Sequence, residues 1–310
     1  MALSNDKRHL HPKDALLLAA PHTWAASIMP ALLSIAFAYS MQGFLSVSLT
    51  IALLIAVVLM QSSVNTFNDY FDFVKGADSK NDNVEESDAV LVYNNINPKS
   101  ALALAIAFLI VAFLLGIYCI VSSGWIPLVI AIVGAFIVVV YSGGKTPISY
   151  LPIGEAISGI TMGGLIPLAS FYVLTDSLNW MILVWSIPLI INIGLIMMTN
   201  NTCDIEKDIS AGRKTLPVIL GRLRARTLYK TLIAISVIST VLIVGIWFPS
   251  GIIVLPFMLL ALYPIISKMF ISPLEPKVRV GAMAAVCNMN IVLGTFYAVA
   301  VFASNVQLIL

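Results

Sequence analysis

The chain has 310 residues, of which 60% are hydrophobic and only 10% are charged, and its formal net charge is +2. Because ordinary soluble domains carry about a quarter charged residues, this composition excludes a water-soluble globular protein and indicates an integral membrane protein. Too little chain remains beside several spans of about 20 residues for a separate soluble domain of about 100 residues. We therefore expect one membrane domain over residues 1–310, with the lipid bilayer as its surroundings and no nucleic-acid partner.

In chain order, a short polar tail precedes a series of apolar segments. The tail carries Lys7, Arg8 and Lys13 and has no clear small-residue cleavage site, so we expect a retained cytoplasmic tail and no cleaved signal peptide. The nine apolar segments that follow are centred near residues 32, 55, 110, 133, 163, 188, 237, 258 and 294. They predict an all-α fold, a multi-pass bundle of about nine transmembrane helices with cytoplasmic cap loops.

The charged residues are distributed unevenly between the predicted links. The links at 42–44, 122–124, 175–179 and 249–251 contain no lysine or arginine, and all 17 basic residues lie in the tail or in the other links. The positive-inside rule therefore predicts a cytoplasmic N-terminus in the cell membrane. Of the 15 acidic residues, 14 lie on the same side as the basic residues, with Asp176 as the exception. Since the rule does not sort acids, this surplus of carboxylates at one face needs its own explanation.

Two polar clusters account for part of that surplus. The second apolar segment ends in Asn65, Asn68, Asp69 and Asp72. The sixth segment ends in Asn200, Asn201, Asp204 and Asp208. On a helix, each set spans about 100° and so shares one face. A single acidic stripe at a helix end is more often a solvated cap, but two similar stripes favour a site.

Four predicted spans separate the two clusters, so both emerge at the same membrane face and can face each other. Four carboxylates without a matching set of interior cations repel one another at low dielectric unless a divalent metal binds between them. Hard oxygen ligands suit magnesium, which usually takes one or two protein carboxylates and completes its shell with water and phosphate. The pattern predicts a pocket for a Mg²⁺-bound diphosphate at the mouth of an apolar cavity.

These motifs resemble those of the UbiA superfamily of intramembrane prenyltransferases, whose nine-helix bundle carries aspartate motifs on helices two and six. Asn68-Asp69-x-x-Asp72 and Asp204-x-x-x-Asp208 match both motifs, and the second match continues through Lys214-Thr215-Leu216-Pro217-Val218 to Gly221. Within the superfamily the chain is most similar to the MenA branch, the 1,4-dihydroxy-2-naphthoate polyprenyltransferases. The similarity to that branch rests on Asn68-Asp69-Tyr70, Gly76-x-Asp78, Pro21-His22-Thr23 and Tyr141-Ser142-Gly143-Gly144 leading to Gly154-Glu155.

The resemblance implies a Mg²⁺-dependent enzyme that joins a polyprenyl diphosphate to 1,4-dihydroxy-2-naphthoate with loss of CO₂ and diphosphate. The product is demethylmenaquinone, in menaquinone biosynthesis. The implied catalytic and metal-binding residues are Asp69, Asp72, Asp204 and Asp208. The implied substrate-binding residues are Asn65, Asn68, Asn201, Lys145, Lys214, Tyr141 and Glu155. Glu155 could position the acceptor or accept a proton, or it could simply stabilise the start of the fifth helix.

Two other functions stay open at this point. A sibling enzyme could prenylate a different acceptor, such as hydroxybenzoate, haem, a chlorophyll precursor or a glycerol phosphate. A cation-coupled transporter would place ionisable groups near the bilayer midplane. The mid-span regions contain no Lys, Arg, Asp or Glu and only amides such as Asn192, Asn288 and Asn290, which favours the enzyme.

Overall fold

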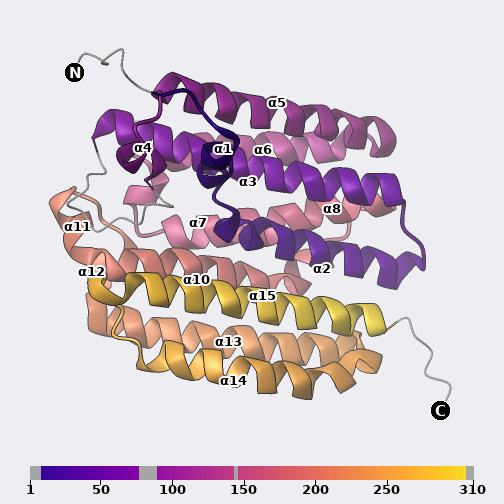
Figure 1. The fold of residues 1–310 in the computed structure, drawn as a ribbon. Coiled ribbons are helices and arrows are strands. Elements are labelled where there is room, and N and C mark those ends of the chain that lie inside the picture. Colours follow the sequence, from indigo (N-terminus) through magenta and orange to yellow (C-terminus); the bar gives the residue numbers. More distant parts are fainter. Residues whose placement is uncertain (1–7, 77–88, 143–145, 305–310) are drawn as a thin grey trace. The chain divides into compact units, whose positions relative to one another are not determined.

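The computed structural model describes residues 8–76, 89–142 and 146–304. Every regular element within these ranges is a helix, apart from one isolated parallel bridge between Arg8 and Ile96 (Figure 1). This confirms the predicted all-α fold. Because a bilayer offers no partner for backbone N–H and C=O groups, helices that bond their own backbone are the expected solution for such an apolar chain.

Seven helical stretches in the described residues are long and apolar enough to cross a membrane. They are Ala25–Gln42, Val47–Val74, Pro98–Ser123, Gly154–Thr175, Arg222–Trp247, Pro249–Ile271 and Pro276–Ala303. Two shorter apolar helices, Ile126–Tyr141 and Ile187–Cys203, lie at the two remaining predicted positions. The chain is therefore a multi-pass membrane protein, and the arrangement is consistent with nine spans.

The chain forms two compact units, Met1–Trp24 with Ala52–Tyr118 and Ala25–Ile51 with Cys119–Leu310. The first unit contains α1 (Pro12–Ala19), η1 (Pro21–Thr23), most of α3 (Val47–Lys75), α4 (Val90–Tyr93) and most of α5 (Pro98–Ser123). Its core joins these pieces through the buried side chains of Leu18, Val90, Leu91, Ile96 and Ala101. The prediction of a single domain over residues 1–310 stays a prediction.

The second unit is built around α10 (Ile187–Cys203), which packs against α7 (Gly154–Ile160), α13 (Arg222–Trp247) and α15 (Arg279–Ala303). Helix α15 also packs against α2 (Ala25–Gln42) and α14 (Leu255–Ile271). The remaining elements are α6 (Ile126–Ser142), η2 (Ile148–Tyr150), η3 (Thr161–Leu165), α8 (Ile166–Thr175), α9 (Met181–Trp185), α11 (Ile205–Ser210), α12 (Leu216–Leu220), η4 (Pro249–Val254) and η5 (Pro276–Val278). Phe37, Trp185, Phe248 and Tyr297 are buried and form a group of contacting rings that joins α2, α9, the end of α13 and α15.

The contact between α7–η3 and α10 is unusually close because it is lined by glycines. A Cβ atom on Gly163 would lie 2.6 Å from the backbone N of Ile190, and one on Gly159 would overlap the carbonyl oxygen of Ile190. From the other side, a Cβ on Gly194 would lie 3.2 Å from the carbonyl oxygen of Glu155. Glycines allow helix backbones to approach closely in membranes, and here Gly163 lies in a π-helical turn, η3.

We predict that Gly163→Ala destabilises the protein by about 1–3 kcal/mol, because the new methyl group has no room against the backbone of α10. The thermal unfolding midpoint in detergent measures the effect. Gly245→Ala in α13 is the matched control, since a Cβ there meets nothing within 4 Å. Equal midpoints for the two variants would contradict the tight packing.

Candidate active site

The first polar cluster lies on α3, in the first unit, and its best defined member is Asp69. The Asp69 carboxylate is buried, with 8% of the residue exposed. Its two oxygens accept hydrogen bonds from the backbone N–H groups of Val90, at 2.7 Å, and Leu91, at 3.2 Å. Asp69 therefore fixes the start of α4 through both oxygens. A carboxylate oxygen can accept more than one bond, so these two hydrogen bonds do not by themselves prevent a metal contact.

Asn65 makes contacts that are structural. Its Nδ2 donates to the carbonyl oxygen of Ala19, at 3.0 Å, and to Thr23 Oγ1, at 2.8 Å. Its Oδ1 accepts a bond from Gln61 Nε2, at 3.2 Å. Asn65 thus anchors the turn between α1 and η1, where Ala20 has the left-handed φ of 48°. The sequence predicted Asn65 to bind substrate, whereas in the structure its hydrogen bonds stabilise the segment Ala19–Thr23.

The four polar residues of the first cluster differ in how far they are buried. All four of its polar residues lie on the continuous helix α3, as predicted. Asp69 is buried and Asn65 is half-buried, and both bind parts of the first unit, whereas Asn68 is exposed and Asp72 is half-buried. Asn68 is thus the most exposed of the four.

The second polar cluster lies at the end of α10, in the second unit. Helix α10 ends at Cys203 and α11 begins at Ile205, so the helix predicted to continue through Asp208 is interrupted at Asp204. The backbone N–H of Asp204 still donates to Asn200, at 3.0 Å, and that of Asp208 donates to Asp204, at 2.8 Å. These helical bonds keep the polar residues about one turn apart despite the break.

Asp204 is paired with an arginine from the start of α15. Arg279 Nε lies 3.2 Å from Asp204 Oδ2, and Arg279 Nη2 donates to Asn200 Oδ1 at 2.6 Å. Burial raises the pKa of the Asp204 carboxyl above its usual range, and the positive charge of Arg279 opposes this rise. Arg279 therefore connects two members of the cluster.

Asp208 has its own partners in the motif that follows α11. Thr215 Oγ1 donates to Asp208 Oδ2 at 3.1 Å, and Arg213 Nη1 lies 3.5 Å from Asp208 Oδ1. The guanidinium of Arg213 also lies over the ring of Tyr150, 4.9 Å from its centroid. Burial raises the pKa of Asp208, whose side chain is 3% exposed, while Arg213 and Thr215 act in the opposite direction. The Nε of Arg213 is buried and makes no hydrogen bond within the described part of the chain.

A buried amide–carboxylate pair completes the second cluster. Asn201 Nδ2 donates to Glu155 Oε1 at 2.8 Å, and the two residues are 8% and 5% exposed. Among the described residues, Glu155 Oε2 has no hydrogen-bond partner. Glu155 lies in the first turn of α7, as predicted. Its side chain accepts its hydrogen bond from Asn201 of α10 and not from a backbone N–H at the start of α7. A buried acceptor without a partner is costly, so it points to a ligand.

The other predicted residues take different positions. Tyr141 is half-buried at the end of α6, and a Cβ on Gly154 would lie 3.7 Å from its hydroxyl oxygen, so this hydroxyl lies beside the start of α7. The side chain of Lys214 is exposed, while its backbone N–H donates to the carbonyl oxygen of Tyr150 at 2.8 Å. Lys145 lies outside the described residues.

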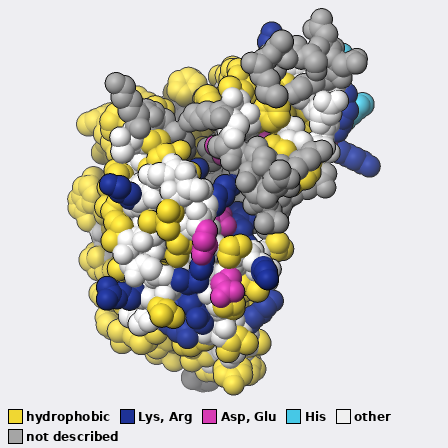
Figure 2. Space-filling model, turned by 90° about the vertical axis from the view of Figure 1, so that its left-hand side faces the viewer, with side chains coloured by type: hydrophobic (Ala, Val, Ile, Leu, Met, Phe, Trp, Pro, Cys, Tyr) yellow, Lys and Arg dark blue, Asp and Glu magenta, His cyan; other side chains and the backbone are white. Residues whose placement is uncertain are grey.

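Sequence reasoning missed the arginines of the second cluster. It treated the carboxylates as lacking matching cations, which is wrong for Asp204 and Asp208, since Arg279 and Arg213 lie beside them. Arg213 stands within the matched motif that ends at Gly221 and could have been found there. Arg279 is 75 residues from Asp204, and no local pattern connects them. Figure 2 shows the result, acidic side chains among lysines and arginines on the face where α10 ends.

Arg222 forms a further ion pair at this end of the unit. Its Nη1 and Nη2 donate to the carboxylate of Glu206, both at 2.8 Å. This bidentate contact lowers the pKa of Glu206 to about 2. Because Glu206 is exposed, with 62% of its side chain accessible, the pair serves mainly to orient α11 against α13.

The donor chemistry of the second cluster suits a metal that arrives with phosphate. Within residues 8–76, 89–142 and 146–304, no group of three or more His, Cys, Asp or Glu side chains forms a ready metal centre. Mg²⁺ needs no such centre, since it usually takes one or two carboxylates and fills its shell with water and substrate phosphate. Asp204 and Asp208 supply hard oxygens, and the buried Nε of Arg213 is a spare donor for an anion.

We predict that Thr215→Val destabilises the protein by about 1–3 kcal/mol, because the buried Asp208 Oδ2 loses its hydroxyl donor. Thr215→Ser keeps the hydroxyl and serves as the control, with a much smaller expected loss. Thermal unfolding in detergent measures both variants. A loss in the serine variant as large as that in the valine variant would assign the effect to the methyl group.

Comparisons with known proteins place this geometry in context. The profile described as the UbiA prenyltransferase family matches residues 27–286. The 1,4-dihydroxy-2-naphthoate octaprenyltransferase of Bacillus subtilis (strain 168) is 39% identical over 226 residues, which cover 72% of this chain and 71% of that protein. The human UbiA prenyltransferase domain-containing protein 1 is 30% identical over 228 residues, covering 70% of this chain and 64% of that protein.

Solved structures support the same fold. A UbiA homolog from Aeropyrum pernix K1 superposes with a TM-score of 0.64 at 15% identity, covering 89% of this chain and 96% of that chain. A UbiA homolog from Archaeoglobus fulgidus bound to DMAPP and Mg²⁺ gives a TM-score of 0.60 at 18% identity, covering 93% and 99%. The resemblance that the two aspartate motifs indicated is confirmed by the family match over residues 27–286.

Proposed function

Because the chain belongs to the UbiA prenyltransferase family, whose profile matches residues 27–286, we propose that it prenylates 1,4-dihydroxy-2-naphthoate. The donor is an allylic polyprenyl diphosphate, and diphosphate and CO₂ are released. The immediate product is the hydroquinone form of demethylmenaquinone, because the transfer leaves the oxidation state of the ring unchanged, and it belongs to menaquinone biosynthesis. The observation that carries the choice of acceptor is the 39% identity to the Bacillus subtilis octaprenyltransferase that uses it.

We assign the diphosphate to the two aspartate motifs. Asp72, Asp204 and Asp208, together with Asp69, would hold Mg²⁺ that arrives with the donor. When bound, Mg²⁺ neutralises charge on the departing diphosphate, so the allylic C–O bond can ionise. The Mg²⁺-bound homolog from Archaeoglobus fulgidus supports a divalent metal in this fold. Asn68 lies open beside Asp72 and would donate to phosphate oxygens.

Cations of the chain would bind the same diphosphate. Arg213 has a buried Nε without a partner among the described residues, and the guanidinium is held in place by Asp208 and the Tyr150 ring. Arg279 is fixed in the same way between Asp204 and Asn200. Guanidinium groups held by carboxylates are oriented before the substrate arrives, which lowers the cost of binding charge as it develops. Lys145 and Lys214 remain proposed phosphate contacts.

Glu155 would bind the acceptor. Asn201 occupies Oε1, so Oε2 is the atom available to accept a hydrogen bond from an acceptor hydroxyl. The hydroxyl of Tyr141, beside Gly154, lies close to the same helix start. Its ring offers a π face to the allylic cation, which must be kept away from water. Asn201 is thus a positioning residue: it orients Glu155 through Oε1 and leaves Oε2 for a hydroxyl group of the aromatic acceptor.

We further propose that the N-terminus and the links after the aspartate motifs lie on the cytoplasmic side of the cell membrane. All 17 lysines and arginines lie in the tail or in links of that side. A water-soluble acceptor and a Mg²⁺-bound diphosphate would then reach the site from the cytoplasm, while the prenyl chain stays in the bilayer.

The deciding experiment incubates the purified protein with 1,4-dihydroxy-2-naphthoate and a series of allylic diphosphates, with Mg²⁺ or with EDTA. Mass spectrometry of the lipid products should show a Mg²⁺-dependent adduct that lacks the carboxyl group. Parallel reactions with hydroxybenzoate and glycerol phosphate acceptors test the sibling activities. A product from one of these acceptors alone would overturn the proposed acceptor while leaving prenyl transfer intact.

We predict that replacing the motif aspartates has different effects on turnover and stability. Asp72→Asn and Asp204→Asn should lower kcat by about 10²-fold or more, a loss typical of removing charge stabilisation. Asp204→Asn should also lower the thermal midpoint, because Arg279 loses its charged partner. Asp69→Asn should lower both kcat and the midpoint, because the amide replaces one of the two acceptors of the Val90 and Leu91 N–H groups. Turnover near that of the unaltered protein in Asp72→Asn and Asp204→Asn would refute the metal assignment.

Glu155→Gln should lower kcat by about 10²-fold while the KM for the prenyl diphosphate changes little, because the residue is assigned to the acceptor. Glu206→Gln provides the matched control, since Glu206 is exposed and paired with Arg222. Steady-state kinetics with each substrate varied in turn give the two constants. An increase confined to the prenyl diphosphate KM would move Glu155 to the donor side of the site.

A further inference from the structure

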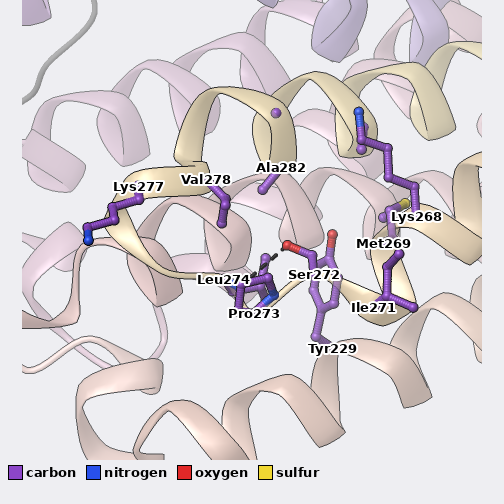
Figure 3. Close-up of a pocket in the computed structure, with 12 residues that line it drawn as sticks. Tyr229, Lys268, Met269, Ile271, Ser272, Pro273, Leu274, Lys277, Val278 and Ala282 are labelled. Carbon is purple, nitrogen blue, oxygen red and sulfur yellow. Dashed lines mark hydrogen bonds between the residues drawn. The ribbon is translucent and has the colours of Figure 1, made fainter.

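A pocket separate from the aspartate clusters opens in the second unit where α14 ends and α15 begins (Figure 3). Its volume is about 490 Å³, and its walls come from the end of α14, the link 272–278, the first turns of α15 and Tyr229 of α13. Arg222 holds the link in place, since its Nε donates to the carbonyl oxygen of Leu274 at 2.9 Å. The pocket is therefore formed by fixed elements.

The floor of this pocket is apolar, and the Tyr229 hydroxyl beneath it already has a hydrogen-bond partner. Met269, Ala282 and Ala285 are buried and line it, and Tyr229 is 1% exposed. The Tyr229 hydroxyl lies 3.2 Å from Thr199 Oγ1, so its polar atom has a partner inside the protein. Beside this floor, Ile271 is 79% exposed on the outer surface. An apolar surface of this kind, in a membrane protein, suits a hydrocarbon chain.

The charges at the pocket all have one sign. Lys268 and Lys277 are exposed and line it from two different elements, and none of the lining residues is acidic. The Ser272 hydroxyl lies between them in sequence and lines the pocket too. Of the nearby carboxylates, Glu206 is paired with Arg222, and Glu275 is exposed on the same link. A ligand with a negative head group and an apolar chain would complement both parts.

The depth of the pocket in the membrane fits the same ligand. Span Pro249–Ile271 ends at the pocket, and span Pro276–Ala303 begins there. The pocket thus lies at the level where membrane-spanning helices leave the bilayer, on the side to which the basic residues are assigned. Basic pockets between helices at this level bind the phosphates of anionic lipids.

We propose that this pocket binds an anionic phospholipid, such as phosphatidylglycerol. The amino groups of Lys268 and Lys277 lie at opposite ends of the pocket in Figure 3, so both side chains turn inward to contact the phosphate. The Ser272 hydroxyl adds a hydrogen bond, and one acyl chain lies along Met269, Ala282 and Ala285. The ligand is a membrane lipid and not free phosphate, because the apolar floor gives affinity only to a ligand that carries a chain. The proposal uses none of the residues assigned to prenyl transfer.

Native mass spectrometry of the full chain tests the proposal, with the protein extracted from nanodiscs of equal parts phosphatidylglycerol and phosphatidylcholine. Unaltered protein should retain phosphatidylglycerol in preference to phosphatidylcholine. Lys268→Ala/Lys277→Ala should lower the retained phosphatidylglycerol at least fivefold. The control Lys99→Ala/Arg224→Ala removes the same charge from two exposed sites elsewhere and should leave retention unchanged.

A second variant fills the pocket without changing charge. Gly281 lines the pocket, and a Cβ there meets nothing within 4 Å, so Gly281→Leu should fold and exclude the acyl chain. Gly245→Leu is its control, since Gly245 is equally open in α13. Thermal unfolding verifies that all variants are folded. Unchanged retention in both Lys268→Ala/Lys277→Ala and Gly281→Leu, equal retention of the two lipids, or full displacement by millimolar inorganic phosphate would overturn the proposal.

Discussion

The close approach of α7 and η3 to α10 is the constraint on which the second cluster depends. Gly159, Gly163 and Gly194 remove the side chains that would otherwise separate the backbones. Only at this separation can Asn201 on α10 reach Glu155 on α7 with a bond of 2.8 Å. The packing is purely a matter of shape, whereas the pair that it creates is polar and buried. A contact between backbones thus determines the geometry of a proposed acceptor site.

The charged groups of the second cluster are arranged so that an anion can bind with little rearrangement. Burial penalises the charged forms of Asp204 and Asp208, and each is compensated by one arginine. The arginines are themselves held by additional contacts, with Asn200 and with the Tyr150 ring. Charged groups that are oriented in advance need little rearrangement when a substrate charge develops. The cluster therefore combines hard oxygen donors with guanidinium donors, the pair of chemistries that a metal-bound diphosphate requires.

Sequence reasoning predicted the membrane helices and both aspartate motifs because these depend on local composition and spacing. The spans at Ala25–Gln42 and Pro276–Ala303 follow directly from runs of apolar residues. The partnership of Arg279 with Asp204 joins residues that are far apart in the chain, so no periodicity could reveal it. The interruption of the helix at Asp204 was also missed, because none of the residues there is a strong helix breaker. The role of Asn65 as an anchor depends on where Ala19 and Thr23 fold, which is a property of the tertiary structure.

The bonds between Asp69 and the N–H groups of Val90 and Leu91 make these two amides natural reporters of the first motif. An amide proton that is bonded to a buried carboxylate exchanges slowly with solvent, and it exchanges faster when the bond weakens. If a cation draws charge from the Asp69 carboxylate, the same oxygens become poorer acceptors. Hydrogen–deuterium exchange at Val90 and Leu91 would then follow the occupancy of the motif directly, in the intact protein and without any label.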